Sequence, residues 1–324
     1  MDIPADTYQQ RFHARWGHLT QPHVRALAWL LDAPDLLDPD DPHWEGRIAS
    51  VGAMSPDVVA WLDALDADPS ALLTALGERS YTRLGLYAEK LMAFYYQSQG
   101  MLVAHGVQVR AARDNTVGEF DFLLDAGPEG VEHIEFATKL YLLEGEAAAR
   151  FDTFVGPNLA DSLGLKMRKI FQRQLTLGQH PAAQPLLPRP VVRARALVKG
   201  WLFYPLGTEQ VIGGISPRHC RGFWCALSEL DRLAGTRFVV LPRLEWLAPY
   251  RSGDRDAAID GAELAVRLAA QFDQALMPVL VAAVREQDGV LAECWRGFVV
   301  PDDWRARAAV RRKIFSAPDA DAPS

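Results

Sequence analysis

Cysteine is scarce in this sequence: Cys220, Cys225 and Cys294 are the only three in 324 residues. Three cysteines cannot all pair with one another, and none lies in the CxxC spacing typical of redox or zinc sites. A fold stabilised by several disulfides is therefore not expected. We predict reduced, buried thiols in a cytoplasmic protein.

Long apolar runs are also lacking. The longest, Ala275 to Val284, covers about half the length of a membrane-spanning helix. The first residues, MDIPADTYQQRF, are acidic and polar, unlike a secretory signal. The sequence holds no Gly-rich loop of the Walker A or dinucleotide-binding type. It therefore predicts no membrane partner and no cofactor that such loops would bind.

Basic residues are too few to balance the acidic ones. Lys and Arg number 34 and Asp and Glu 41, for a net charge of −7, which by itself disfavours nucleic acid as a partner. The distribution is uneven, however. Residues 1–80 carry thirteen acidic and five basic side chains, whereas residues 160–200 carry eight basic and one acidic. Such a segment suits a polyanion, and it equally suits an ordinary solvated helix face.

What is present is a clear succession of periodic segments. Apolar residues at three- and four-residue spacing predict helices over much of 8–76, with Ser55 and Pro56 at one helix start. The patterns that follow predict a helix at 82–100, strands at 101–111, 116–126 and 131–143, a helix at 158–178 and a strand at 191–205. Beyond them we predict a strand-like segment at 237–249, a helix at 261–276, and two strands within 278–301 joined by a turn at Asp288-Gly289.

These patterns divide the chain into four parts. We predict a helical N-terminal extension at 1–80, a core at 81–205, a C-terminal α+β extension packed on that core at 206–315, and a disordered tail at 316–324. The fold class is α/β, with a core ordered as helix, three strands, helix and strand.

Acidic residues interrupt two of the predicted strands. Side chains alternate across a strand, so Glu119 and Asp121 share one face of the second strand, and Glu135 and Lys139 share one face of the third. Several carboxylates on adjacent strands need a cation, and one lysine does not balance them. Mg²⁺ suits such a group, because it takes one or two carboxylates together with water and substrate oxygens. If that face is wet, the same residues are ordinary surface side chains in weak pairs.

At these residues the sequence resembles the PD-(D/E)XK nuclease superfamily. More closely, it resembles the bacterial family Domain of Unknown Function 1853, usually grouped with those nucleases. The closer likeness lies in the stretches GLYAEKLMAFYY, VGEFDFLL, HIEFATKLYLL, GPNLADSLGLKMRKIFQRQL, KGWLFYP and RGFVVPDDW. The resemblance implies a restriction-endonuclease-like core and cleavage of phosphodiester bonds with Mg²⁺ or Mn²⁺, and no other cofactor.

Carried over by position, Asp121 matches the metal-binding Asp, Glu89 the acid of the first helix, and Glu135 and Lys139 the Glu and Lys of the third strand. The resemblance thus implies Asp121, Glu135 and Glu89 as metal ligands, with Lys139 assisting the attacking water. The chain departs from the Glu-x-Lys pattern, because Glu135 and Lys139 are four residues apart. Along a strand that is about 13 Å.

The basic helix fits the same expectation. Lys166, Lys169 and Arg173 recur at helical spacing, and with Gln174 they are expected to contact the phosphate backbone of DNA, or of RNA. The stretched Glu-to-Lys spacing motivates an alternative, an inactive nuclease-fold protein that binds nucleic acid or a protein. In a third reading, the acidic N-terminal helices dock a partner protein.

Overall fold

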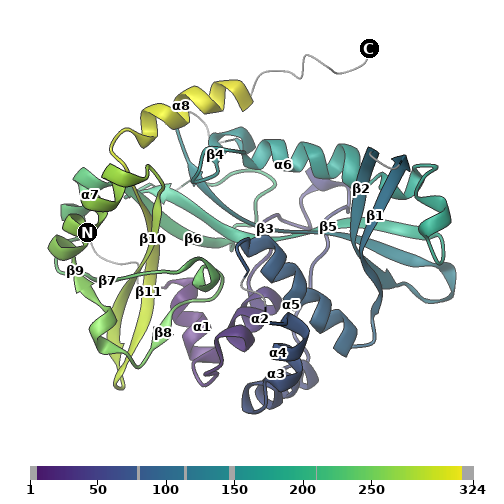
Figure 1. Ribbon diagram of the computed structural model, residues 1–324, viewed down its shortest axis with the longest axis horizontal. Coiled ribbons are helices and arrows are strands. Elements are labelled where there is room, and N and C mark those ends of the chain that lie inside the picture. Colours follow the sequence, from purple (N-terminus) through teal and green to yellow (C-terminus); the bar gives the residue numbers. More distant parts are fainter. Residues whose placement is uncertain (1–5, 79–80, 113–114, 146–149, 209, 316–324) are drawn as a thin grey trace.

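A computed structural model describes residues 6–78, 81–112, 115–145, 150–208 and 210–315. Its centre is a single mixed sheet that runs the length of the molecule (Figure 1). The strand order is β1-β2-β3-β5-β6-β11-β10-β7-β9, with β4 paired to β3 and β8 to β11. The strands are β1 (Leu102–Ala112), β2 (Asn115–Asp125), β3 (Val131–Leu143), β4 (Phe154–Val155), β5 (Val191–Pro205), β6 (Cys220–Ala226), β7 (Arg237–Val240), β8 (Arg251–Ser252), β9 (Ile259–Asp260), β10 (Val279–Gln287) and β11 (Val290–Val300).

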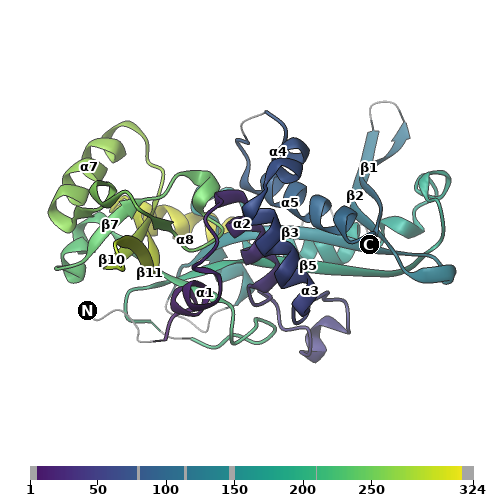
Figure 2. The same cartoon turned by 90° about the horizontal axis from the view of Figure 1, so that it is seen from below.

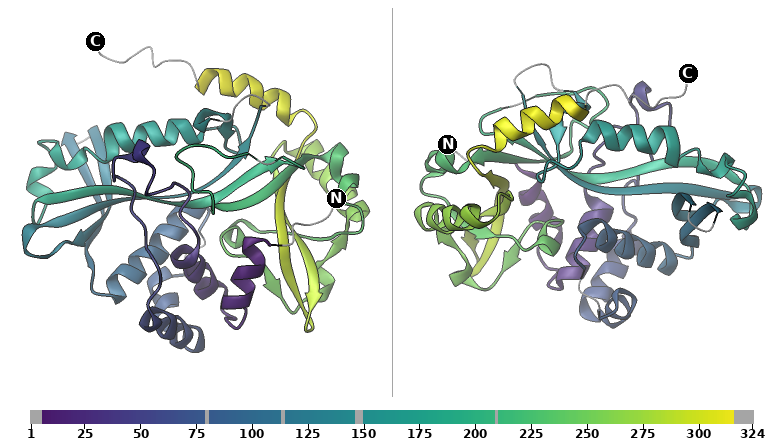
Figure 3. Two further views of the ribbon diagram at one scale, coloured as in Figure 1. Left: turned by 180° about the vertical axis from the view of Figure 1, so that it is seen from behind. Right: turned by 45° about the horizontal axis from the view of Figure 1, so that its top comes forward.

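Helices cover both faces of this sheet. They are α1 (Tyr8–Trp16), α2 (Pro22–Asp32), α3 (Pro56–Ala67), α4 (Ser70–Leu76), α5 (Leu84–Ser98), α6 (Leu163–Lys169), α7 (Gly261–Gln274) and α8 (Trp304–Phe315). Figure 2 shows α1, α2 and α5 lying across one face, and Figure 3 shows α6 and α8 on the other. The predicted mixed α/β architecture is therefore confirmed. Across the described ranges, no helix is long and apolar enough to cross a bilayer.

Strand β3 lies between the two helical layers, and its sequence explains why. Ile134, Phe136 and Leu140 pack in the core cluster that contains the α2 and α5 side chains. Ala137 and Tyr141 pack in the cluster that contains the α6 side chains. Both faces of β3 are therefore covered, and its residues are buried almost without interruption, polar side chains such as His133 and Glu135 included.

The pairing around β3 is mixed. It is antiparallel to β2 and parallel to β5, and β5 is in turn parallel to β6. Helix α6 lies in the connection from β3 to β5. The order α5, β1, β2, β3, α6, β5 follows the sequence prediction for residues 81–205, apart from the short strand β4 between β3 and α6, which was not predicted. The sheet continues without a break from β5 into the strands of the C-terminal region.

Several predicted boundaries are wrong in detail. The helix expected from Asn158 begins at Leu163, where the Ser162 side chain accepts a hydrogen bond from the Leu165 N–H. It continues from Ile170 to Gln174 as a π-helical turn. In the segment 237–249, only β7 is a strand. Strand β6 and helix α8 were not predicted, and the predicted disordered tail at 316–324 lies outside the described residues.

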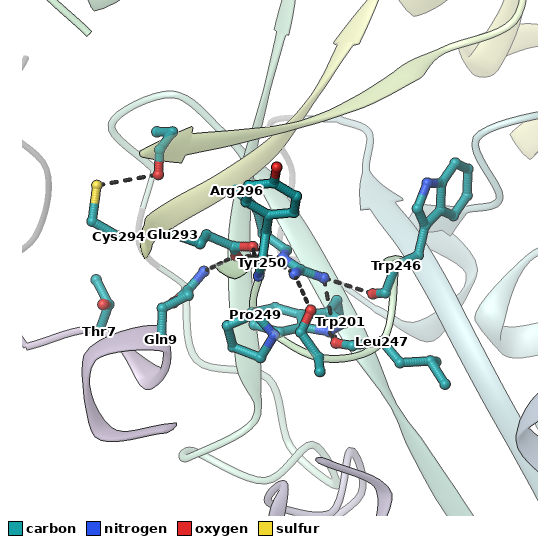
Figure 4. A network of polar contacts seen from close by, with 12 residues as sticks. Thr7, Gln9, Trp201, Trp246, Leu247, Pro249, Tyr250, Glu293, Cys294 and Arg296 are labelled. Carbon is teal, nitrogen blue, oxygen red and sulfur yellow. Dashed lines mark hydrogen bonds and ion pairs between the residues drawn. The ribbon is translucent and has the colours of Figure 1, made fainter. Parts of the chain in front are cut away.

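A buried ion pair joins the N-terminal helices to the C-terminal strands (Figure 4). Arg296 and Glu293 have fully buried side chains, and the Arg296 Nε lies 2.6 Å from the Glu293 Oε1. Glu293 also accepts from Gln9 Nε2 and from the Tyr250 N–H. Arg296 donates to the Trp246 carbonyl. Because its partners satisfy both charges, this pair fixes the segment 246–250 against α1 and β11.

The three cysteines are free and buried, as the sequence predicted. Burial raises the pKa of the Cys220 and Cys225 thiols to about 12 and that of Cys294 to about 11. They are therefore protonated at neutral pH and serve as small apolar core residues.

Candidate functional site

The candidate site lies where β2 leaves β3. The pairing of β2 with β3 ends at Phe122 and Ile134. The next strand on that side of β3 is β4, which pairs with β3 at Leu142 and Leu143. Within the described chain, residues 135–141 thus have no strand neighbour on one side, a stretch we call the open edge of β3. Their other side pairs fully with β5.

A bend in the β1–β2 hairpin opens this edge. His105 pairs with Phe122 and Val107 with Phe120, so Gly106 lies opposite Asp121 in the hairpin. Gly106 has a φ of +63°, a backbone conformation that favours glycine. On one side of the bend Phe122 packs in the α5 cluster, and on the other Phe120 packs in a cluster with Leu177. Phe120 and Phe122, which would share a face in a regular strand, therefore pack on opposite faces of the sheet.

The side chain of Asp121 forms a hydrogen bond to β3 just beyond the point where the backbone pairing of β2 and β3 ends. Its Oδ2 accepts a hydrogen bond from the backbone N–H of Phe136 at 2.9 Å. That N–H is the first on the open edge, where a β2 carbonyl would otherwise accept it. The contact fixes the carboxyl group of Asp121 beside the strand that carries Glu135.

Asp121 and Glu135 have neighbouring carboxyl groups in a nearly dry environment. Glu135 is only 1% exposed, its Oε1 accepts a hydrogen bond from Lys166, and its carboxyl group is also hydrogen-bonded to that of Asp121. Burial, followed by the negative charge of Asp121, raises the pKa of Glu135 to about 8. Burial also raises the pKa of Asp121. At neutral pH the pair therefore shares a proton, which a bound cation would displace.

Glu89 approaches the same point from α5. Its pKa is raised to about 7 by burial, and then by the charges of Asp121 and Glu119. The charge of Asp121 thus acts on both Glu89 and Glu135. The structure brings these three sequence-predicted carboxylates into one neighbourhood, and Glu119 lies beside it.

The donor set suits a hard cation that keeps most of its water. In the part of the chain that the structure describes, no three Asp, Glu, His or Cys side chains converge closely enough to form a ready-made metal cage. Two adjacent, largely buried carboxyl groups are present, and the proton they share can be replaced by a cation. Mg²⁺ binds to one or two carboxylates in this way, so the residues fit such an ion.

The lysine beside Glu135 is Lys166 from α6. Its Nζ lies 3.3 Å from the Glu135 Oε1 and 3.3 Å from the Gln174 Oε1. Lys139, expected at this position, instead places its Nζ 3.2 Å from the Asp161 Oδ2. The structure therefore groups Lys166, and not Lys139, with the carboxylates.

The remaining basic residues of the helix point elsewhere. Lys169 and Arg173 are exposed, and neither forms an ion pair with any described residue. Gln174 lies in the π-helical turn and accepts a hydrogen bond from Lys166. Arg168, on another side of the helix, pairs with Asp152.

Comparison with known proteins gives one match. A family model described as a domain of unknown function (DUF1853) matches residues 25–300, which is most of the chain and includes every residue of the candidate site. No curated protein and no solved structure matches the chain.

Proposed function

The chain belongs to the DUF1853 family, and we propose that it is a metal-dependent phosphodiesterase that acts on DNA. The observation that carries this proposal is the Asp121–Glu135 pair at the open edge of β3. Two largely buried carboxyl groups share a proton there, and the Lys166 ammonium lies beside Glu135. This combination is typical of a site for a divalent cation and a phosphate.

The arrangement of elements supports the same proposal. We propose that residues 81–205 form a restriction-endonuclease-like core. An antiparallel β1–β2–β3 sheet, a helix in the β3–β5 connection and a parallel β5 support this assignment. In that core the carboxylates lie where the second and third strands part.

Asp121 and Glu135 would hold Mg²⁺ or Mn²⁺, with Glu89 supporting it. Such an ion activates water and offsets charge on a reacting phosphodiester. The chain's own residues prepare the site. The Phe136 N–H orients Asp121, Glu135 would release its proton to water when the ion binds, and Lys166 would stabilise negative charge on the phosphate. Lys169 and Arg173 would contact the backbone of the nucleic acid.

The test is cleavage of linear and plasmid DNA, with a matching RNA substrate, by the full chain in Mg²⁺, Mn²⁺ or EDTA. We expect cleavage with either ion and none with EDTA. Asp121→Asn and Glu135→Gln should each abolish it, and Lys166→Met should lower the rate about 100-fold or more.

The matched control is Glu129→Gln, which changes an exposed carboxylate in the turn between β2 and β3 and should cut like the unmodified chain. Cleavage that persists in the folded Asp121→Asn and Glu135→Gln variants would rule out the proposed site.

A specific observation favours a second candidate, an inactive nuclease-fold protein that binds nucleic acid. Lys139 is engaged by Asp161, and burial keeps Glu135 protonated up to a pH of about 8. This candidate predicts salt-sensitive DNA binding in EDTA and no cleavage with any divalent ion.

A further inference from the structure

A small pocket lies farther along the open edge of β3, at the N-terminus of α5. Its volume is about 220 Å³, and Arg83, Gly85, Thr138, Lys139, Asp161 and Arg243 are among its lining residues. It therefore joins the start of α5, the open edge of β3, the loop that holds Asp161, the loop that follows β7, and residues 277–278 before β10.

The charge of this pocket is positive. Arg83, Lys139 and Arg243 supply three cations against the single acid Asp161. Asp161 accepts from Lys139 Nζ at 3.2 Å and from the Tyr141 hydroxyl at 3.0 Å. An ammonium group has three donors, so the bond to Asp161 leaves Lys139 able to bind a further acceptor.

The guanidinium groups of Arg83 and Arg243 are available to bind an anionic ligand. Within the described ranges, neither Arg83 nor Arg243 forms an ion pair. The Arg243 guanidinium lies over the Trp246 ring, 5.2 Å from its centroid. Because the Trp246 carbonyl is held by Arg296 of the buried ion pair, Arg243 is presented from a fixed segment.

Helix α5 directs its positive end toward the same pocket. It is 15 residues long, Arg83 at its N-cap makes no capping side-chain hydrogen bond, and no acidic residue lies in its first turn. The first N–H groups of such a helix have no partner within the helix, and they attract anions. A Cβ atom added at Gly85 would meet nothing within 4 Å, so the approach to these N–H groups is open.

Thr138 provides an independent indication of a missing ligand. Its side chain is 8% exposed, it lines the pocket, and its Oγ1 has no hydrogen-bond partner among the described residues. A buried hydroxyl without a partner destabilises the folded state, so such groups are seldom left unsatisfied. Here it lies on the stretch of β3 that also lacks a neighbouring strand.

We propose that this pocket binds one phosphate group of a nucleic-acid strand, beside the carboxylate site and separate from it. A volume of about 220 Å³ is below the roughly 300–1,000 Å³ of pockets that enclose whole drug-sized ligands. A single phosphate suits it better than a complete nucleotide. The nucleic-acid source rests on the proposed function, whereas the phosphate chemistry rests on the pocket alone.

This assignment also gives Lys139 a role. Lys139 follows Glu135 by four residues on an extended strand, about 13 Å away. It is therefore a substrate-binding residue that holds a phosphate away from the reacting one, and the Asp161–Tyr141 pair positions its ammonium group.

The experiment measures binding of inorganic phosphate to the full chain by calorimetry in EDTA, which removes any contribution of a metal. Arg243→Gln and Thr138→Val should each lower phosphate affinity at least 5-fold, and together at least 20-fold. Arg267→Gln, an exposed arginine on α7, is the matched control and should not change it. Circular dichroism and melting temperature identify the variants that are folded.

A second arm identifies the source of the phosphate. Short oligonucleotides with a 5′-phosphate, a 3′-phosphate or neither should compete with inorganic phosphate, and this competition should weaken in the folded Arg243→Gln variant. Phosphate binding that is equal in the unmodified chain and the folded double variant, or no binding at all, would overturn the inference.

Different results would contradict the phosphate pocket and the phosphodiesterase activity. Phosphate binding that depends on Arg243, in a chain that cuts no nucleic acid with any ion, supports the pocket and contradicts the phosphodiesterase. Cleavage that depends on Asp121, without phosphate binding at the pocket, contradicts the pocket alone.

Discussion

At the scale of single residues, Glu135 is the most constrained group of the candidate site. Its carboxyl group is buried between Asp121, which disfavours its charge, and Lys166, which favours it. Burial and Asp121 together outweigh the lysine, so the pKa rises to about 8. A carboxyl group held in this way releases its proton readily once a divalent cation adds the missing positive charge.

This proton predicts a pH-dependent stability. The unfolded chain releases it near pH 4.5 and the folded chain near pH 8, so the folded state binds the additional proton between those values. The free energy of unfolding should therefore fall as pH rises from about 5 to 8, by on the order of 3 kcal/mol from this group. Urea unfolding in EDTA at a series of pH values measures it.

Glu135→Gln is the informative variant for this measurement. It removes the titrating group and should flatten the decline, while Glu129→Gln should keep the slope of the unmodified chain. Glu89, with a pKa of about 7, should leave a smaller slope in Glu135→Gln. Parallel curves for the unmodified chain and Glu135→Gln would contradict a shared proton.

Strand alternation showed which of these carboxylates share a face, and the family resemblance implied them as metal ligands. It could not assign the lysines in the same way. Lys166 reaches Glu135 only because α6 packs on β3, and the position of that helix depends on a cap at Ser162. Lys139 is engaged by Asp161, which lies 22 residues later in a loop that the sequence predicted as the start of a helix.

At the scale of elements, long periodic segments were predictable and short or irregular ones were not. α5, β3 and β5 have strong apolar patterns, and the structure gives them nearly the expected bounds. β6 has only seven residues, and α8 buries only a few side chains, such as Trp304 and Phe315. Neither provides enough periodicity to be distinguished from a loop. The π-helical turn after α6 has no sequence signature of its own.

The buried ion pair gives a prediction at this scale. Arg296→Met leaves the Glu293 carboxylate buried without its cation, so we expect a loss of about 3–5 kcal/mol in the free energy of unfolding. Urea denaturation at constant pH measures it. Because Arg296 also fixes the segment that presents Arg243, the folded variant should bind phosphate more weakly too.

The control for this prediction is a double variant. Glu293→Leu with Arg296→Met replaces both charges and should cost less than the sum of the two single changes. Additive losses would show that the pair contributes nothing as a pair.

At the scale of the whole molecule, the surface around residues 160–200 carries less unpaired positive charge than the sequence suggested. Six of the eight basic side chains in residues 160–200 form ion pairs: Lys166 with Glu135, Arg168 with Asp152, Arg189 with Asp125, Arg193 and Arg195 with Glu132, and Lys199 with Asp35. Most of these acids belong to neighbouring strands or distant loops, so a window of sequence cannot count them. Lys169 and Arg173 are the members of this segment without an acidic partner in the described chain.

The distribution of paired and unpaired cations predicts how DNA binding responds to salt. Each cation that neutralises a phosphate contributes about 0.9 to the slope of log affinity against log salt concentration on duplex DNA. If Lys169 and Arg173 contact the backbone, the double change to Gln should lower the magnitude of that slope by about 2, uniformly across DNA sequences. Fluorescence anisotropy in EDTA between low and moderate salt measures it. Arg189→Gln with Arg193→Gln removes the same formal charge from side chains already held by Asp125 and Glu132. An equal loss of slope in that control would mean that net charge alone, and not the two unpaired side chains, governs the binding of DNA.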